Sequence, residues 1–226
     1  MERGGRGSSG YARIKQSNPR ESASSAFYLL VTVALAAGES YNGCMTRYVV
    51  IGTSGSGKTT LARQIAERLG IPHIELDALH WDPGWVGVTA EVMRERVAAA
   101  TSGPAWALDG NYSKSRDVAW PRATHLIWLD YSFPLVFWRV LSRTVRRAVL
   151  REELWNGNRE SLRMMFSRES ILVWVITTYG RRRREYPELL ARPEYSHLTV
   201  FRFRTPRETE RWVNTLNKTE LFPDDA

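Results

Sequence analysis

The sequence predicts an α/β fold in which helices cover both faces of a parallel sheet. Five short apolar runs alternate along the chain with segments of helical periodicity, and this alternation is typical of parallel strands joined by crossover helices. The first apolar run leads directly into a glycine-rich stretch and then into a helical segment. Ligands of such sheets bind beyond the carboxyl ends of the strands, so the polar residues that follow each run are the candidate site residues.

Each expected element rests on its own pattern. The apolar runs have the length and composition of strands buried on both faces, and they cover residues 48–51, 74–76, 105–108, 126–129 and 198–201. Gly70 is placed to end the first helix, and Thr89 to cap the second. The expected helices cover residues 59–69, 89–100, 134–150, 160–178 and 206–216.

The stretch GTSGSGKTT fits the spacing G-x-x-x-x-G-K-[ST]. Its glycines let the backbone approach an anion closely, its amides can form an anion-binding nest, and the next helix presents its positive end. Lys58 is expected on the β and γ phosphate oxygens and the Thr59 hydroxyl on Mg²⁺. The sequence therefore predicts a phosphate-binding loop made of Gly52, Thr53, Ser54, Gly55, Ser56, Gly57, Lys58, Thr59 and Thr60.

Composition limits the remaining classes. A chain of 226 residues with 43% hydrophobic content supports one domain with a real core. The net charge of +8 implies an anionic partner, for which nucleotide phosphates and nucleic acid both qualify. Cys44 is the single cysteine, which excludes an intramolecular disulfide and a cysteine metal site and suits a reducing cytoplasm. No apolar run reaches membrane-spanning length.

Three aspartates follow apolar runs. Asp77 ends the second run, where its carboxylate can accept hydrogen bonds from an acceptor substrate or, alternatively, cap a helix. Asp109 ends the third run, and it can hold the magnesium if that strand lies beside the first. Asp130 has the same form and competes for this role. The Gly110–Asn111 turn after Asp109 suits a site-lining loop better, so Asp109 is preferred.

Arginines are further candidates for binding the phosphoryl group, because guanidinium groups can neutralise its charge from several sides during transfer. The candidates lie on the helical segment 134–150, around residues 151–163, and in the run 181–184. We expect this run at a helix C-terminus, where cations suit the helix dipole. A solvated helix face remains the alternative for most of them.

The stretches IGTSGSGKTTLARQIAERLGIPHIELDALHW, LDGNYS and WLDYSFPLVFWRVLSRT resemble the nucleoside monophosphate kinase and shikimate kinase-like group of P-loop kinases. More narrowly, they resemble adenylate kinase-like bacterial proteins often labelled DNA topology modulation proteins, over about residues 46–217. The resemblance implies a P-loop NTPase three-layer sandwich with a five-stranded parallel sheet of order 2-3-1-4-5. It also implies a helical arginine-rich lid, ATP with Mg²⁺, and an acceptor site between the second and third strands.

The resemblance assigns residues one at a time. Asp109 and Gly110 match the Asp-Gly that follows the third strand of adenylate kinases, whereas Asn111 departs and the nearest arginine is Arg116. Arg139 and Arg143 match an Arg-x-x-x-Arg pattern, and Asp77 corresponds to the acceptor-site aspartate of shikimate-type kinases. The expected catalytic set is Lys58, Asp109, Arg116, Arg143 and Arg151, the acceptor set is Asp77, Trp81 and Asn111, and the metal set is Thr59 and Asp109.

These observations predict a kinase that moves the ATP γ-phosphoryl to a small acceptor, with a nucleoside monophosphate among the candidates. A nucleotide-switched nucleic-acid-binding protein and a plain NTPase are the alternatives. Trp81, Trp85, Trp106 and Trp120 can form an aromatic wall at the acceptor side or a packed core. A cytoplasmic monomer or simple homodimer without a membrane partner is expected.

The same sequence patterns and resemblance predict the domain boundaries. The kinase-like domain is expected at residues 45–217, with a lid or insert at about 150–196 and a polar tail at 218–226. Residues 1–44 are basic, then apolar, and residues 34–36 resemble a signal-peptidase site. A non-native or disordered extension, a tail and a true signal are the three interpretations. Because an ATP-dependent enzyme would find little nucleotide outside the cell, we expect the first.

Overall fold

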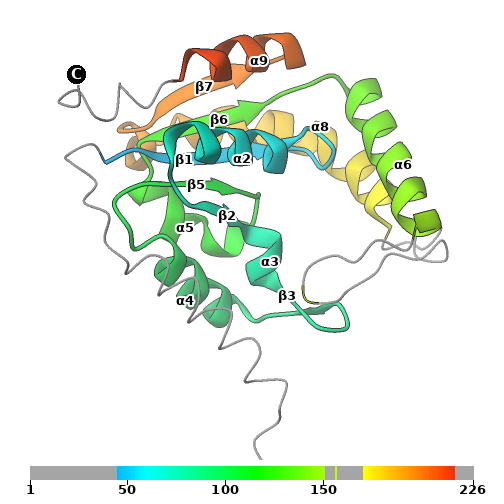
Figure 1. The fold of residues 1–226 in the computed structure, drawn as a ribbon, viewed down its shortest axis with the longest axis horizontal. Helices are drawn as coiled ribbons and strands as arrows, with labels where there is room; N and C mark the ends of the chain where they lie inside the picture. Colours follow the sequence, from blue (N-terminus) through cyan, green and yellow to red (C-terminus); the bar gives the residue numbers. More distant parts are fainter. Residues whose placement is uncertain (1–44, 151–155, 157–169, 217–226) are drawn as a thin grey trace, which may run out of the picture. The chain divides into compact units, whose positions relative to one another are not determined.

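The computed structural model describes residues 45–150, 156 and 170–216. Helices cover both faces of a five-stranded parallel sheet (Figure 1), which confirms the predicted α/β class. The elements run in the order β1 (Arg47–Gly52), α2 (Lys58–Leu69), β2 (His73–Glu75), α3 (Leu76–His80), β3 (Trp81–Asp82), β4 (Val86–Gly87), α4 (Ala90–Ala100), β5 (Trp106–Asp109), α5 (Arg116–Ala119), β6 (His125–Leu129), α6 (Phe133–Leu150), α8 (Ile171–Leu190), β7 (Thr199–Phe203) and α9 (Pro206–Thr215).

The sheet has the order β2-β5-β1-β6-β7, and each neighbouring pair is parallel. Counted along the chain, these strands have the expected order 2-3-1-4-5. Val50 of the central β1 lies opposite Asp109 of β5, and Gly52 lies opposite Leu129 of β6. The carboxyl ends of β5, β1 and β6 therefore meet at one edge, from which the glycine-rich loop leaves β1.

The core explains why these segments pair as they do. On one face of the sheet, Val50 and Ile127 belong to a buried cluster with Leu61 and Ile65 of α2 and Val213 of α9. Successive strand residues point to opposite faces. Trp128, next to Ile127, accordingly meets Tyr186 of α8 edge-on, with ring centroids 5.5 Å apart. Burial on both faces accounts for the unbroken apolar runs in the sequence.

The second strand ends one residue earlier than predicted, and this changes the position of Asp77. β2 ends at Glu75, and the chain turns at once into α3, so Asp77 lies in the first turn of that helix and not at the tip of a strand. Leu76 and Leu79 are both buried, and their spacing of three suits a helical turn. The small antiparallel pair β3–β4, which no sequence pattern predicted, follows directly.

In the described part, the helix predicted at 160–178 is confirmed only from Ile171 onward, and its predicted end near the arginine run is wrong. α8 begins at Ile171, after the Ser170 hydroxyl accepts a hydrogen bond from the Val173 amide at 3.3 Å, and it continues to Leu190. The run 181–184 therefore lies inside α8. Gly180 and Pro187 do not break this helix because its buried side, which includes Tyr186, packs against the sheet.

Several predictions fall on residues outside the described ranges. These are the nature of residues 1–44, the tail at 218–226, and the parts of the proposed lid at 151–155 and 157–169. Among the residues that are described, none of the helices is both long and apolar enough to cross a bilayer.

Candidate active site

The glycine-rich loop connects β1 to α2 in a conformation that its glycines make possible. Gly55 has φ +82°, and a Cβ there would lie 2.7 Å from the carbonyl oxygen of Val136. Gly57, at φ +94°, is the N-cap of α2, so the helix begins at Lys58. The first amides of a helix lack partners within it. The N-terminus of α2 follows the loop directly, and such a helix end is suited to a bound phosphate.

Lys58 lies where the loop enters α2. Its Nζ donates to the Thr53 carbonyl oxygen at 3.3 Å. Burial lowers the pKa of Lys58 to about 8, against the opposing charges of Asp109 and Asp77, and the charges of Arg182 and Arg143 lower it further. A bound polyphosphate would favour the charged form of this amine. The loop thus buries the Lys58 amine close enough to Asp109 and Asp77 for their charges to act on it.

Asp109 connects β5 to the loop. The Thr59 hydroxyl donates to Asp109 Oδ1 at 2.8 Å, and His73 Nε2 lies 2.8 Å from Oδ2. A hydroxyl and a carboxylate are hard oxygen donors of the kind that Mg²⁺ takes, so Thr59 and Asp109 fit the predicted metal role. The sequence predicts only a wall residue at His73, because the spacing of His73 and His80 matches no metal-binding motif.

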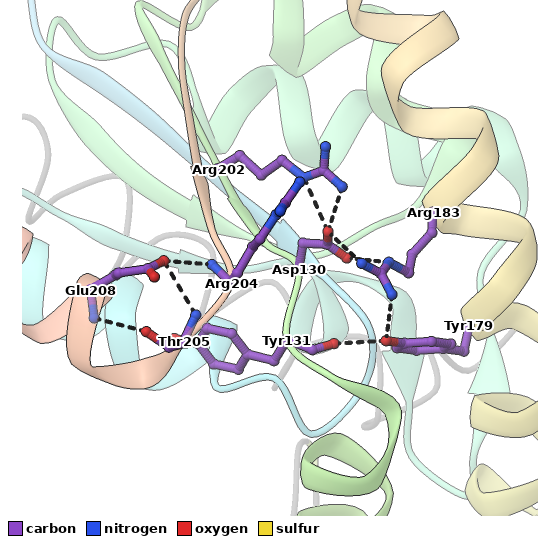
Figure 2. Close-up of polar contacts among 8 residues, drawn as sticks. All are labelled: Asp130, Tyr131, Tyr179, Arg183, Arg202, Arg204, Thr205 and Glu208. Atoms are coloured by element: carbon purple, nitrogen blue, oxygen red, sulfur yellow. Dashed lines mark hydrogen bonds and ion pairs between the residues drawn. The ribbon is translucent and has the colours of Figure 1, made fainter.

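Asp130 lies at the opposite side of β1, just after β6. Figure 2 shows its carboxylate between two guanidinium groups, with Arg183 Nε at 2.7 Å and Arg202 Nη2 at 2.6 Å. Tyr179 donates to the Tyr131 carbonyl oxygen at 2.9 Å and accepts from Arg183, which anchors α8 at the same place. The Asp130 carboxylate is thus already engaged by two cations.

Figure 2 also shows how the last helix begins. The Thr205 hydroxyl accepts from the Glu208 amide at 3.3 Å, and the Glu208 carboxylate accepts from the Arg204 amide at 2.8 Å. This capping arrangement satisfies the amides at the N-terminus of α9. These polar groups are therefore engaged within the fold, next to the Asp130 cluster.

The expected acceptor residues divide into two groups. Asp77 Oδ1 accepts a hydrogen bond from the Tyr112 hydroxyl at 2.6 Å, and the Tyr112 ring lies 4.6 Å from the His80 ring. Burial and the Asp77 charge raise the pKa of Tyr112, so the phenol stays protonated. Trp81 packs edge-on against His80 at 4.6 Å. Tyr112, which follows the Gly110–Asn111 turn, belongs to this group and had no motif to mark it.

Asn111 lies elsewhere. Its side-chain oxygen accepts from the Gly52 amide at 3.1 Å, and its amide donates to the Gly52 carbonyl oxygen. In the structure it therefore holds the first residue of the phosphate loop and not an acceptor. Of the four tryptophans in the proposed aromatic wall, Trp106 and Trp120 are core residues, 1% and 4% exposed, while Trp81 and Trp85 pack edge-on at 5.6 Å.

The arginines are distributed differently from expectation. Arg139 Nη1 reaches the Ser56 carbonyl oxygen at 3.5 Å, and Arg143 and Arg182 are near enough to affect the pKa of Lys58. Arg182 carried no individual signal, because it lies within a run of four arginines. Arg116 instead lies over the Trp120 ring, 5.0 Å from its centroid. It also lines a hollow with Glu185 and Arg192.

Two arginines of the run 181–184 form ion pairs, and one expected catalytic arginine lies outside the described residues. Arg181 pairs with Glu185 at 3.5 Å and Arg183 with Asp130, so the run on α8 is not a uniformly solvated basic face. Arg151 lies outside the described residues. Its expected catalytic role stays a prediction.

Comparisons with known proteins give partial matches. A model of the ATPase family associated with various cellular activities (AAA) matches residues 48–107. A probable gluconokinase from Schizosaccharomyces pombe is 58% identical over 33 residues, which are 15% of this chain and 17% of that protein. The chain thus spans about a sixth of the length of this curated relative.

Solved structures of similar chains include kinases at low identity. A sugar kinase from Janibacter sp. HTCC2649 is 22% identical with a TM-score of 0.44, covering 79% of this chain and 96% of its own. A shikimate kinase from Bacteroides thetaiotaomicron is 16% identical with a TM-score of 0.44, covering 79% and 98%. A gluconokinase from Sinorhizobium meliloti 1021 is 20% identical with a TM-score of 0.42, covering 80% and 98%. The narrower resemblance to DNA topology modulation proteins stays a prediction.

Proposed function

We propose that this protein is an ATP-dependent phosphotransferase that moves the γ-phosphoryl group of ATP to a hydroxyl of a small acceptor. The observation that carries the proposal is the hydrogen bond of 2.8 Å between Thr59 of the phosphate loop and Asp109 of the neighbouring strand. It joins the loop to a carboxylate at the sheet edge where nucleotides bind in folds of this class.

Different residues of the loop would bind different parts of the nucleotide. The amides of Gly55 to Lys58 would hold the β and γ phosphates, and Lys58 would neutralise the oxygens that carry charge during transfer. Thr59 and Asp109 would hold Mg²⁺, which supplies further charge neutralisation when bound. Arg139, Arg143 and Arg182 surround the same region and can neutralise the transferred group from other sides.

Asp77 and Tyr112 favour a hydroxyl as the acceptor group. The Asp77 carboxylate accepts hydrogen bonds, whereas it would repel a phosphate placed against it. In the transfer, the acceptor oxygen forms a bond to the γ-phosphorus while the bond to the ADP oxygen breaks, and the hydroxyl proton leaves toward Asp77 or solvent. The sugar acid implied by the name of the gluconokinase relative is one acceptor to test.

The test is ADP formation with a panel of acceptors. The panel contains sugar acids, other hydroxylated metabolites and nucleoside monophosphates, each with ATP and Mg²⁺. We expect one hydroxylated class to raise ADP formation well above the acceptor-free rate, and Lys58→Ala to abolish this increase. Arg68→Ala is the matched control, because Arg68 is an exposed cation at the other end of the same helix.

Two results would contradict the proposal. If ADP forms at the same rate with every acceptor and without one, the protein is a plain NTPase. If nucleoside monophosphates alone stimulated ADP formation, the protein would still be a kinase, but the proposed hydroxyl acceptor and the proposed role of Asp77 would be wrong.

A further inference from the structure

Asp109 is held on both of its carboxylate oxygens. Thr59 of α2 donates to Oδ1, and His73 of β2 lies 2.8 Å from Oδ2. Since an ionised carboxylate only accepts hydrogen bonds, His73 Nε2 is the donor. The Asp109 residue is 4% exposed, so water has little access to replace either donor.

We propose that His73 is a positioning residue for Asp109: by donating to one oxygen, it keeps the other directed at Thr59, where the magnesium of the bound nucleotide is to be held. The assignment rests on the proposed function, because it concerns the metal of that same site. Partners of this kind, one step removed from the metal, fix the orientation of ligating groups.

The sheet register explains how His73 reaches Asp109. In the parallel pair β2–β5, His73 lies opposite Ala107 and Glu75 lies opposite Asp109. Residues two apart on a strand share a face, so His73 and Asp109 project from the same side of the sheet. The His73 side chain is only 17% exposed, and its ring therefore lies along this face, directed at the carboxylate.

Glu75 supports a competing interpretation. Donor atoms of His73, Glu75 and Asp109 all lie within 4.8 Å of one another, a grouping that could hold a transition metal. However, Glu75 also lies 3.9 Å from the Arg63 guanidinium. The positioning role needs only His73 and Asp109, whereas a three-ligand metal site needs Glu75 as well. The two interpretations therefore predict different results for Glu75→Gln.

The experiment measures how Mg²⁺ strengthens ATP binding, by titration calorimetry of the full chain over a series of magnesium concentrations. His73→Leu should raise the Mg²⁺ concentration at half-maximal effect about tenfold, as expected for loss of an outer-shell partner. It should leave the Kd for metal-free ATP unchanged. His73→Gln, whose amide nitrogen falls near the position of Nε2, should restore most of the effect, and Glu75→Gln should behave as the unaltered protein.

Each other result overturns the assignment. An unchanged Mg²⁺ dependence in His73→Leu removes the positioning role. A loss in Glu75→Gln equal to that in His73→Leu identifies a three-ligand site instead, and weaker metal-free ATP binding in His73→Leu indicates a structural effect. If His73→Leu fails to fold, His73→Asn replaces it, because the shorter amide cannot reach Oδ2. Absence of ATP binding by the unaltered chain overturns the proposed function itself.

Discussion

Asp109 and Asp130 occupy matching positions on the two sides of β1 and have opposite surroundings. Both follow buried strands, and both are 4% exposed. Asp109 receives hydrogen bonds from Thr59 and His73, whereas Asp130 forms ion pairs with Arg183 and Arg202. The first carboxylate remains suited to a metal ion, while the second is engaged in holding α8 and β7 together. A pattern shared by two strands thus occurs in two different environments.

The difference arises from what each flanking strand has beside it. β5 has β2 as its other neighbour and α2 nearby, and these contribute a histidine and a hydroxyl. β6 has β7 and α8, and these contribute two arginines. Guanidinium groups compete with a bound metal for the same carboxylate oxygens, whereas the hydroxyl of Thr59 can itself turn to a metal.

The largest expected effect is that of Asp109→Asn. The amide lacks the charge that attracts Mg²⁺, and a bound metal ion contributes several kcal/mol to stabilising the transferred group, so acceptor-stimulated ADP formation should fall by about 100-fold or more. The measurement is the steady-state rate at saturating ATP, with the fold checked by circular dichroism. If Asp130→Asn lost activity to this degree and Asp109→Asn did not, the assignment of the two aspartates would be reversed.

Asp130→Asn should act on stability instead. It leaves two guanidinium groups without a counter-charge, and their side chains are 41% and 35% exposed, so solvent reduces the penalty. We expect the free energy of unfolding to fall by about 1–3 kcal/mol. Urea denaturation measures this change, and the rate per folded molecule should stay within about threefold, as for a surface change. An unchanged urea midpoint would mean that the cluster does not hold α8.

Tyr112→Phe and Tyr179→Phe test the two sides of the site separately. Loss of the Tyr112 hydroxyl leaves Asp77 less firmly oriented, so the KM for the acceptor should rise by about tenfold, the equivalent of one hydrogen bond to a charged group. The KM for ATP should not change. Tyr179→Phe removes a hydroxyl on the Asp130 side. If both changes raised the KM for the acceptor equally, the proposal that the acceptor binds near Asp77 would be wrong.

The smallest expected effect is proton uptake on ATP binding. Burial lowers the pKa of Lys58 to about 8, below its ordinary 10.5, and the negative charge of a bound triphosphate would raise it again. Between these values, ATP binding should take up a fraction of one proton. In the same window, stability should rise with pH, because unfolding restores the ordinary pKa and the unfolded chain binds more protons.

Calorimetry in buffers of different ionisation enthalpy measures this proton uptake. Lys58→Met serves as the reference and should show none from this site. Proton release by the unaltered protein in that range would contradict the environment assigned to Lys58.

Much of the fold could be predicted because its signals are local. The apolar runs other than the end of the second one, the cap at Thr89 and the helix end at Gly70 were predicted correctly. The errors came where packing outweighed local preference. α8 continues through Gly180 and Pro187 because its buried side packs on the sheet. β2 ends early because Leu76 and Leu79 are buried as residues of the helix α3.

The glycine-rich loop could be predicted from the sequence alone, because the glycines, the lysine and the hydroxyl that shape it lie within nine consecutive residues, 52–60. Which aspartate lies beside that loop, and which one is paired with arginines, depends on the tertiary structure. The partners of Asp109 lie 36 and 50 residues away along the chain, and those of Asp130 lie 53 and 72 residues away. Contacts at such separations depend on which strands become neighbours, and no local pattern encodes that choice.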